Sequence, residues 1–255
     1  MRLFDSHAHY DDPAFDADRD ALLAALPGRG VAGAVNMGCD LVSSRHAIAL
    51  AQRYSYIYAA VGIHPENAAQ VSENTLAQLE ALAAHPRVVA IGEIGLDYHW
   101  PTPERDIQRH ALRVQMALAR KLGLPVCIHD RDAHADTMEI LSEFPDVPGV
   151  LHCYTGAQEM ARQLTGRGWY IGFTGVVSFK NARKTRLVAQ SVPLSQILIE
   201  TDCPYMAPEP LRGTRSDSSM LAHTAAAIAA ARGMEPEAMA EAAYQNARRF
   251  YRLDE

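Results

Sequence analysis

The feature that most constrains the fold of this chain is a regular alternation of short apolar segments with longer amphipathic ones. We expect strands over eight apolar segments, at residues 2–9, 33–38, 57–64, 88–95, 124–130, 149–154, 169–175 and 197–202. They are continuous apolar runs rather than alternating ones, which is typical of parallel strands buried on both faces. A helical pattern follows each run, and this order predicts an α/β fold, a (β/α)8 TIM barrel.

The segments between and after these runs carry apolar residues at helical spacing. We expect helices over residues 16–26, 41–54, 74–85, 103–123, 135–144, 158–168, 181–191, 218–234 and 235–253. Glycine or proline follows many of them, as is typical of helix ends. The alternative fold is an open doubly wound sheet, which would be expected to carry a glycine-rich phosphate loop after its first strand. The sequence HAHYDD stands there instead, which favours the barrel.

Length and composition set the broad class of protein. The chain has 255 residues, of which 48% are hydrophobic, so we expect one large core and a single domain over residues 1–255. No segment approaches the ~20 apolar residues of a membrane span, and the N-terminal sequence lacks the apolar run of a signal peptide. The four cysteines form no C-x-x-C pair, so we expect a reducing, cytoplasmic location.

The net charge of −6 limits how this chain could bind nucleic acid. A protein that holds duplex DNA by broad neutralisation of phosphates is usually basic. A nucleic-acid substrate would therefore have to be held locally or through metal ions. The segment FKNARKTR, which includes Lys180 and Arg183, follows the seventh expected strand. It could place a helix N-terminus and cations near phosphate, or it could be a solvated basic face.

Ionisable residues gather where the expected strands end. These residues are His7, His9, His64, Glu93, Asp97, His129, Asp130, His152, Glu200 and Asp202. Active-site groups of such barrels come from the carboxyl ends of the strands. Burying this many ionisable groups together would cost roughly several kcal/mol each without compensating cations. The pattern therefore predicts divalent metal ions, with two favoured by the number of ligands. Imidazole and carboxylate donors suit Zn, Mn, Fe, Co or Mg without choosing among them.

Six motifs along the chain resemble one family. FDSHAH, GIHP, IGEIGLDY, PVCIHDRDA, LHCYTG and IETDCPY…P…RG resemble the TatD family of metal-dependent deoxyribonucleases, within the amidohydrolase superfamily. The resemblance implies a TIM barrel with one ion held by His7, His9, Glu93 and Asp202 and a second held by Glu93, His129 and His152. The implied activity is metal-dependent DNA hydrolysis, often as a 3′–5′ exonuclease.

We expect Asp202 and Glu93 to be the catalytic residues. Asp202 would orient or deprotonate the attacking water, and Glu93 could bridge two ions, which we expect to be Mg, Mn or Zn. Substrate contacts are expected from His64, which could instead cap its strand, and from Lys180, Arg183 and Arg212. The expected substrate is DNA, as single strands or 3′ ends, and a monomer is favoured. Aromatic residues after the site strands could stack on bases or pack in the core, namely Tyr98, Trp100, Tyr154 and Tyr205.

One segment departs from the family pattern. After Arg212 and Gly213 this chain reads TRSDSSML, where many relatives read K/R-R-N-E-P in a loop over the site. A metallohydrolase of the same superfamily that acts on a small phosphoester, amide or lactone therefore stays an alternative. The fourth strand carries Glu93 rather than a lysine that could be carbamylated, which disfavours phosphotriesterase-like and dihydroorotase-like enzymes. A binding module without catalysis is a further alternative, although every expected metal ligand is present.

Overall fold

The computed structural model describes residues 1–253, and the eight expected strands all form within them. They are β1 Leu3–Ala8, β2 Val31–Met37, β3 Ile57–Val61, β4 Val88–Asp97, β5 Val126–Arg131, β6 Gly149–Leu151, β7 Tyr170–Phe173 and β8 Ile197–Ile199. The strand order follows the chain from β1 to β8, and the pairings β1–β2, β3–β4, β4–β5, β5–β6 and β7–β8 are parallel. With helices between the strands, this is a (β/α)8 TIM barrel, so the predicted fold class is confirmed.

Helices form at every position where the sequence predicts one. They are α1 Arg19–Ala25, α2 Leu41–Arg53, α3 Glu73–Ala83, α4 Arg105–Leu122, α5 His134–Ser142, α6 Gln158–Gly166, α7 Arg183–Ser191, α8 Leu221–Arg232 and α9 Pro236–Phe250. Short 3-10 helices lie between them: η1 Pro13–Phe15, η2 Pro27–Arg29, η3 Pro65–Gln70, η4 Gly175–Ser178, η5 Leu194–Gln196 and η6 Ser218–Met220. Among residues 1–253, no helix combines the length and the hydropathy needed to cross a membrane.

The chain divides into two compact units. The first unit comprises residues 1–36 and the chain from Cys153 onward, and the second comprises residues 37–152. That the whole chain acts as a single domain stays a prediction. Each unit carries its own group of ionisable strand-end residues, so each can be described by itself.

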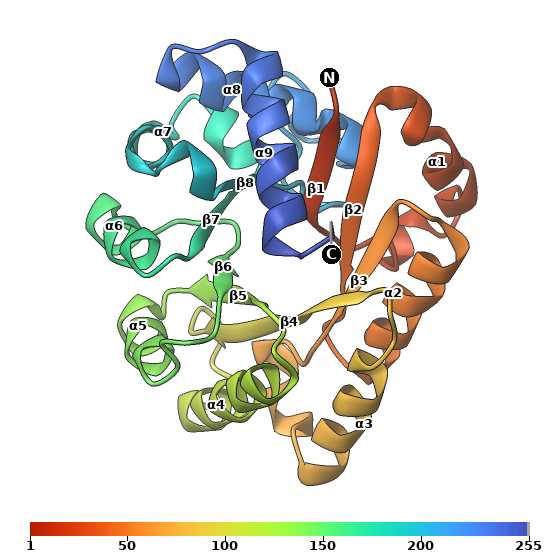
Figure 1. The fold of residues 1–255 in the computed structure, drawn as a ribbon, viewed down its shortest axis with the longest axis vertical. Coiled ribbons are helices and arrows are strands. Elements are labelled where there is room, and N and C mark those ends of the chain that lie inside the picture. Colours follow the sequence, from red (N-terminus) through yellow and green to blue (C-terminus); the bar gives the residue numbers. More distant parts are fainter. Residues whose placement is uncertain (254–255) are drawn as a thin grey trace. The chain divides into compact units, whose positions relative to one another are not determined.

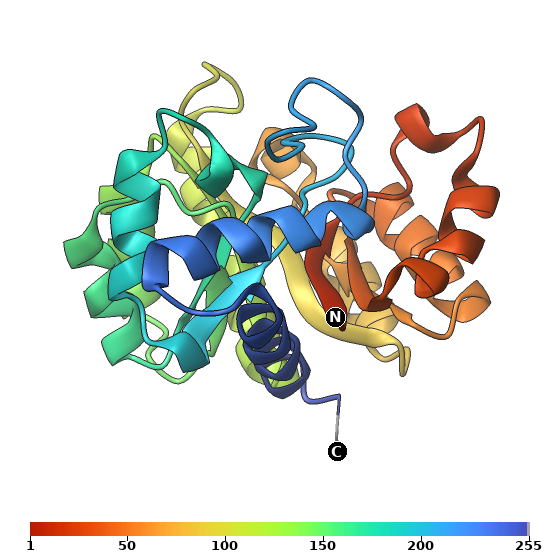
Figure 2. The same ribbon diagram turned by 90° about the horizontal axis from the view of Figure 1, so that it is seen from above.

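In the first unit, helix α9 holds strand β1 in place (Figure 1). The Phe4 ring stacks on Tyr251 at a centroid distance of 6.2 Å and meets Tyr244 edge-on at 6.3 Å. The Tyr251 hydroxyl also donates to the carbonyl of Ser6 at 2.7 Å. Helix α8 packs on α9 and crosses it steeply (Figure 2). These contacts fix the strand that carries His7.

In the second unit, all ten residues of β4 are buried, as expected of a parallel strand covered on both faces. Helix α4 lies against it, and two buried glutamines on α4 reach strand ends. The Gln108 side chain accepts from the N–H of Asp97 at 2.8 Å and donates to the Asp97 carbonyl at 2.9 Å. Gln115 pairs in the same way with Ile63, at 2.8 and 3.1 Å. Both amides hold backbone next to candidate site residues.

A glycine allows β4 and β5 to approach closely where both carry site residues. Gly95 pairs with His129 across the two strands and has a φ of +152°. A Cβ atom at this position would lie 1.9 Å from the His129 carbonyl oxygen. Any larger residue would therefore separate the strand of Glu93 and Asp97 from that of His129.

Candidate active site

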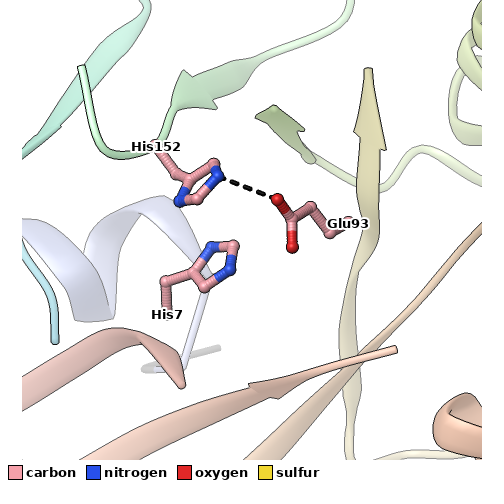
Figure 3. A group of neighbouring side chains, drawn as sticks. All are labelled: His7, Glu93 and His152. Atoms are coloured by element: carbon pink, nitrogen blue, oxygen red, sulfur yellow. Dashed lines mark ion pairs between the residues drawn. The ribbon is translucent and has the colours of Figure 1, made fainter. Parts of the chain in front are cut away.

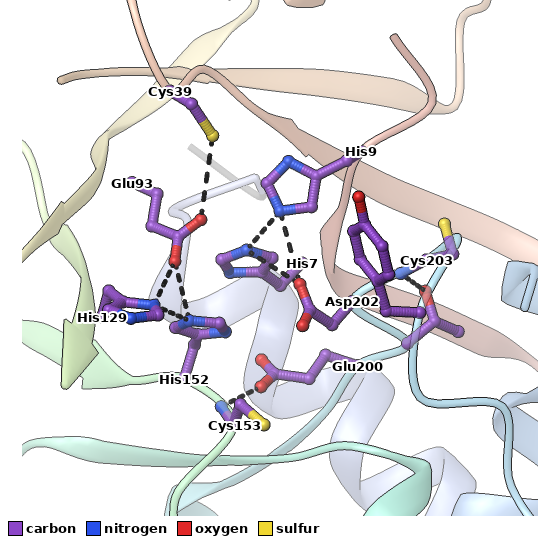
Figure 4. A network of polar contacts seen from close by, with 12 residues as sticks. His7, His9, Cys39, Glu93, His129, His152, Cys153, Glu200, Asp202 and Cys203 are labelled. Carbon is purple, nitrogen blue, oxygen red and sulfur yellow. Dashed lines mark hydrogen bonds and ion pairs between the residues drawn. The ribbon is translucent and has the colours of Figure 1, made fainter. Parts of the chain in front are cut away.

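The first unit brings together two imidazoles and one carboxylate, from His7, His9 and Asp202, which we call the first cluster (Figure 4). The Nε2 atoms of His7 and His9 lie 3.1 Å apart. The Asp202 Oδ1 atom lies 3.7 Å from the His7 Nε2 and 3.4 Å from the His9 Nε2. Tetrahedral ligands of one zinc ion, each about 2.1 Å from it, would lie about 3.4 Å from each other. The donor spacing therefore fits a divalent cation.

The backbone of Asp202 adopts the left-handed region, with a φ of +56°, which is uncommon for a residue other than glycine. Backbone hydrogen bonds on both sides hold it there. Asp202 N–H donates to the His7 carbonyl at 2.9 Å, and His9 N–H donates to the Cys203 carbonyl at 3.0 Å. The ends of β1 and β8 are thus tied together around the carboxylate, which places Asp202 beside both histidines.

The buried carboxylate of Asp5, on β1, supports the position of the segment that carries Asp202. It accepts from the N–H and the hydroxyl of Thr201, at 2.9 and 2.6 Å, and from the Ser218 hydroxyl at 2.6 Å. Burial raises the pKa of Asp5 to about 6, although these hydrogen bonds oppose the rise. Ser218 belongs to the segment TRSDSSML that departs from the family pattern, and it also contacts the Tyr10 hydroxyl at 2.5 Å. The divergent segment is therefore tied to strand β1 at Ser218.

A second buried carboxylate of the first unit, Glu200, lies at the end of β8. It accepts hydrogen bonds from the N–H of Cys153 and from the Ser6 hydroxyl. Its oxygens occupy the space beside Gly172 on β7, where a Cβ atom would come within 2.6 Å of Oε2. Glu200 thus joins the end of β8 to β1 and to the segment after β6, and it packs against β7 at Gly172.

The second unit gathers three imidazoles around one carboxylate, from His64, Glu93, His129 and His152, which we call the second cluster. Glu93 Oε1 lies 2.8 Å from His152 Nε2 (Figure 3). The same oxygen lies 2.9 Å from His129 Nδ1 and 3.6 Å from His64 Nε2. His129 Nδ1 and His152 Nε2 are themselves 3.2 Å apart. Glu93, His129 and His152 therefore offer three converging donors that also fit a divalent cation.

His129 lies between two carboxylates. Its Nδ1 faces Glu93, and its Nε2 lies 3.0 Å from Asp97 Oδ2. Burial favours the neutral ring, but the hydrogen bonds to Asp97 and Glu93 outweigh it and raise the pKa of His129 to about 10. A carboxylate on the far nitrogen orients a ligand histidine and increases its basicity. Asp97 is thus placed to position His129 as a ligand.

His64 has the geometry of a hydrogen-bond donor. Its Nδ1 accepts from the N–H of Glu66 at 3.2 Å and so caps helix η3. In a neutral ring the proton then lies on Nε2, the atom that faces Glu93 Oε1 at 3.6 Å. His64 therefore caps helix η3 rather than its strand and directs an N–H toward Glu93. Its contact with substrate stays a prediction.

A family model described as TatD related DNase matches residues 4–252 of this chain. The chain belongs to the TatD-related DNase family. The metal-dependent hydrolase YabD of Bacillus subtilis, named as uncharacterized, is 40% identical over 254 residues, which are 99% of this chain and 100% of YabD. The 3′–5′ ssDNA/RNA exonuclease TatD of Cronobacter sakazakii is 36% identical over 258 residues, which are 98% of this chain and 97% of that protein.

A solved structure agrees with this assignment. The crystal structure of YJJV, a TatD homolog from Escherichia coli K12, has a TM-score of 0.91 and 30% identity, and each chain is covered to 98%. The predicted family and the predicted hydrolase class are therefore confirmed. This TatD-family chain contains groups of residues that could bind metal ions. Their presence agrees with the name of its relative YabD, a metal-dependent hydrolase.

The expected substrate contacts of this TatD-family chain lie in the first unit, except for His64. Lys180, Arg183 and Arg212 are exposed, and the Arg212 guanidinium lies 4.3 Å above the centre of the Phe179 ring. Arg215, three residues after Arg212, pairs with both oxygens of Asp18, at 2.6 and 2.7 Å. Its charge is therefore compensated within the protein.

The four aromatic candidates divide into exposed and packed side chains. Trp100 and Tyr205 are 50% and 57% exposed, so both could reach a base. Tyr154 is buried, and its hydroxyl donates to the Ala157 carbonyl at 2.7 Å. The Tyr98 hydroxyl donates to Asp136 at 2.5 Å. Tyr154 and Tyr98 therefore have structural roles.

Sequence reasoning missed several supporting residues of the TatD-family site. Asp5 was a visible signal, because it is a charged residue inside an otherwise buried strand. Gln108 and Gln115 gave a weaker signal, as polar residues on the inner face of an amphipathic helix. Cys39, whose Sγ lies 4.0 Å from Glu93 Oε2, is a further donor near the second cluster, and its sequence neighbours gave no indication of it.

Proposed function

We propose that this chain is a divalent-metal-dependent nuclease that removes nucleotides from the 3′ end of single-stranded DNA. One observation carries the proposal: a TatD-family chain has two clusters of converging imidazole and carboxylate donors at its strand ends. Relatives named 3′–5′ ssDNA/RNA exonuclease TatD support the choice of substrate and polarity.

The donor sets assign a role to each ligand. His7, His9 and Asp202 would hold one ion, and Glu93, His129 and His152 would hold another. That Glu93 also serves the first ion follows from the family resemblance and stays a prediction. Mg, Mn and Zn all suit these nitrogen and oxygen donors. When bound, such cations make water a better nucleophile and stabilise negative charge on phosphoryl oxygens.

The residues of this chain supply proton transfer and orientation. Asp202 would accept the proton of the attacking water through a carboxylate oxygen, since it is held rigidly by its backbone beside His7 and His9. His64 would donate its Nε2–H to a phosphate oxygen, because its Nδ1 is already used as an acceptor. Asp97 would keep the His129 ring in the orientation needed for ligation.

The test is hydrolysis of a 5′-labelled single-stranded 20-mer by the purified protein with Mg²⁺, Mn²⁺ or Zn²⁺ added in turn. We expect a ladder that shortens from the 3′ end, and no product from a 20-mer with a blocked 3′ end. Asp202→Asn should slow the reaction roughly 10²–10⁴-fold, the range for loss of a general base. The matched control is Asp146→Asn, which removes the same charge from an exposed pair with Arg120.

Three results would contradict the proposal. The first is full-rate cleavage by Asp202→Asn, which would exclude its role as base. The second is an intact 20-mer with every metal together with turnover of a small phosphodiester, an amide or a lactone, which would favour the alternative hydrolase. The third is oligonucleotide binding without turnover of any of these compounds, which would favour a binding module.

A further inference from the structure

A groove of about 650 Å³ lies beside the segments that follow strands β6 and β7 in the first unit. Its lining includes Thr155, Phe179, Asn181, Arg183, Lys184 and Leu187. Ligand sites of proteins typically have volumes of roughly 300–1,000 Å³. The groove is therefore large enough for part of a polymer or for a small molecule, and it combines an apolar floor with cationic and amide side chains.

The groove lies in a cationic part of an acidic protein. Residues 160–199 contain six lysines and arginines and no aspartate or glutamate, whereas the whole chain has a net charge of −6. Lys180, Arg183 and Lys184 are exposed. Among the residues that the structure describes, these three form no ion pair. Their charge is therefore available to an anionic ligand.

Hydrogen bonds from Arg186 hold the segment of residues 177–180 in place at the groove. The guanidinium of Arg186 donates to the carbonyls of Val177 and Phe179, at 3.2 and 2.6 Å, and to that of Lys180 at 3.3 Å. This arginine fixes the segment that carries Phe179 and Lys180. Arg212, from the segment after β8, covers one face of the Phe179 ring at 4.3 Å. Arg183 and Lys184 therefore line the groove together with Phe179, while Lys180 follows Phe179 in the sequence and Arg212 covers its ring.

The groove is joined to the segment that carries Asp202. Thr174 Oγ1 caps helix η4 by accepting from Val176 N–H at 3.4 Å. Met206, four residues after Asp202, places its Sδ 3.7 Å from this same oxygen and 3.3 Å from Cys153 Sγ. The segments after β6, β7 and β8 therefore meet at one point. They all leave the carboxyl ends of parallel strands, where Asp202 also lies.

We propose that this groove binds the single-stranded polynucleotide that leads away from the first cluster. The phosphates would contact Lys180, Arg183 and Lys184, and a base would lie on Phe179 or on the guanidinium of Arg212. The inference rests on the proposed nuclease function. It explains how a protein of net negative charge can hold a polyanion locally. Stacking on an aromatic side chain is tolerant of base identity, as an exonuclease that passes over many bases requires.

The test measures binding separately from cleavage. Fluorescein-labelled dT16 and rU16 are titrated with the full chain in EDTA, which prevents metal-dependent cutting, at several salt concentrations. Arg183→Gln/Lys184→Gln should weaken binding on the order of 10-fold at low salt. It should also lower the slope of log K against log salt by about 1.4, since each phosphate contact to a single strand contributes about 0.7. Phe179→Leu, which keeps an apolar side chain, should weaken binding on the order of 5-fold or more.

The control is Arg162→Gln/Arg167→Gln, which removes two charges from the same acid-free stretch but on α6 and before β7. It should bind as the unchanged protein does. The proposal that the groove binds polynucleotide would be overturned if Arg183→Gln/Lys184→Gln bound both oligonucleotides with the affinity and the salt slope of the unchanged protein. If the variant has a reduced salt slope but the unchanged protein cuts no oligonucleotide with any metal, polynucleotide binding in the groove is supported and the nuclease function is overturned. The DNA and RNA arms show which polymer the groove prefers.

Discussion

The first and second clusters use the same kinds of donor but hold them in different ways. In the first cluster, backbone hydrogen bonds hold the donors in position, because they tie Asp202 to the end of β1 in a left-handed conformation. In the second cluster, side-chain hydrogen bonds hold the donors in position, because His129 lies between the carboxylates of Glu93 and Asp97. Disturbing the support of the first cluster should therefore affect folding, whereas disturbing that of the second should affect metal affinity.

The largest expected effect comes from removing the shared acid of the second cluster. Glu93→Gln should lower the rate of oligonucleotide cleavage by more than about 10²-fold, beyond the 10–100-fold cost of losing a group behind a metal ligand, because Glu93 Oε1 faces three imidazoles. Rates on the 5′-labelled 20-mer measure this, and Glu104→Gln, at an exposed position before α4, should leave the rate unchanged. A Glu93→Gln protein of unchanged rate would remove the second cluster from the mechanism.

The next effect tests the side-chain support of His129. Asp97→Asn should weaken metal binding roughly 10–100-fold, the range observed when a carboxylate behind a ligand histidine is lost. Competition with a chromogenic chelator measures the affinity. Asp136→Asn is the control, because Asp136 lies in the same unit but accepts from Tyr98 and Arg109 rather than from a ligand. Equal affinities for the two variants would mean that Asp97 does not support the ligand.

A smaller effect is expected from the buried Asp5 carboxylate, which supports the strand ends that carry the first cluster. Thr201→Val removes a hydroxyl donor from the buried Asp5 and should lower the free energy of unfolding by about 1–3 kcal/mol. Urea denaturation in EDTA measures this without a contribution from metal. Thr137→Val is a close control, because the Thr137 hydroxyl is buried and has no hydrogen-bond partner among the described residues. The comparison fails if both substitutions cost the same.

The smallest effect is a pH dependence in the second unit that belongs to neither cluster. The hydrogen bond that His134 donates to the Asp130 carboxylate raises the pKa of His134 above its ordinary value, although burial opposes it. The stabilisation is then fully present below the ordinary pKa of about 6.5 and is lost as the pH rises through the raised value. Because His134 is 42% exposed, His134→Gln should cost less than about 1 kcal/mol at pH 6. Urea denaturation at pH 6 and pH 9 should show this difference shrinking, and a constant difference would contradict it.

The sequence predicted the strands well because burial on both faces requires continuous apolar runs. The ends of the strands were less certain: β6 ends at Leu151 rather than 154, and β8 at Ile199 rather than 202. A site residue follows in both places: His152 comes directly after Leu151, and Asp202 comes three residues after Ile199. Polar residues that serve the site leave the regular ladder there, so their hydropathy could not mark the boundary.

Residues that act through a distant partner could not be predicted. Asp5 and Ser218 are 213 positions apart, and their hydrogen bond exists only once β1 and η6 are adjacent. Gln115 bonds to Ile63 across 52 positions, and only the packing of α4 shows what its amide contacts. The candidate metal ligands could be predicted from the sequence because the carboxyl ends of parallel strands share an edge. This rule needs no knowledge of individual contacts. Their roles as ligands stay predictions.

The carboxylate of Glu200 occupies the volume that any side chain at position 172 would need. These two positions therefore cannot change independently. Among aligned relatives, we expect a larger residue at position 172 only where position 200 has become short or uncharged. Covariation between the two sites would then record a steric constraint, and should not be mistaken for a shared role in chemistry.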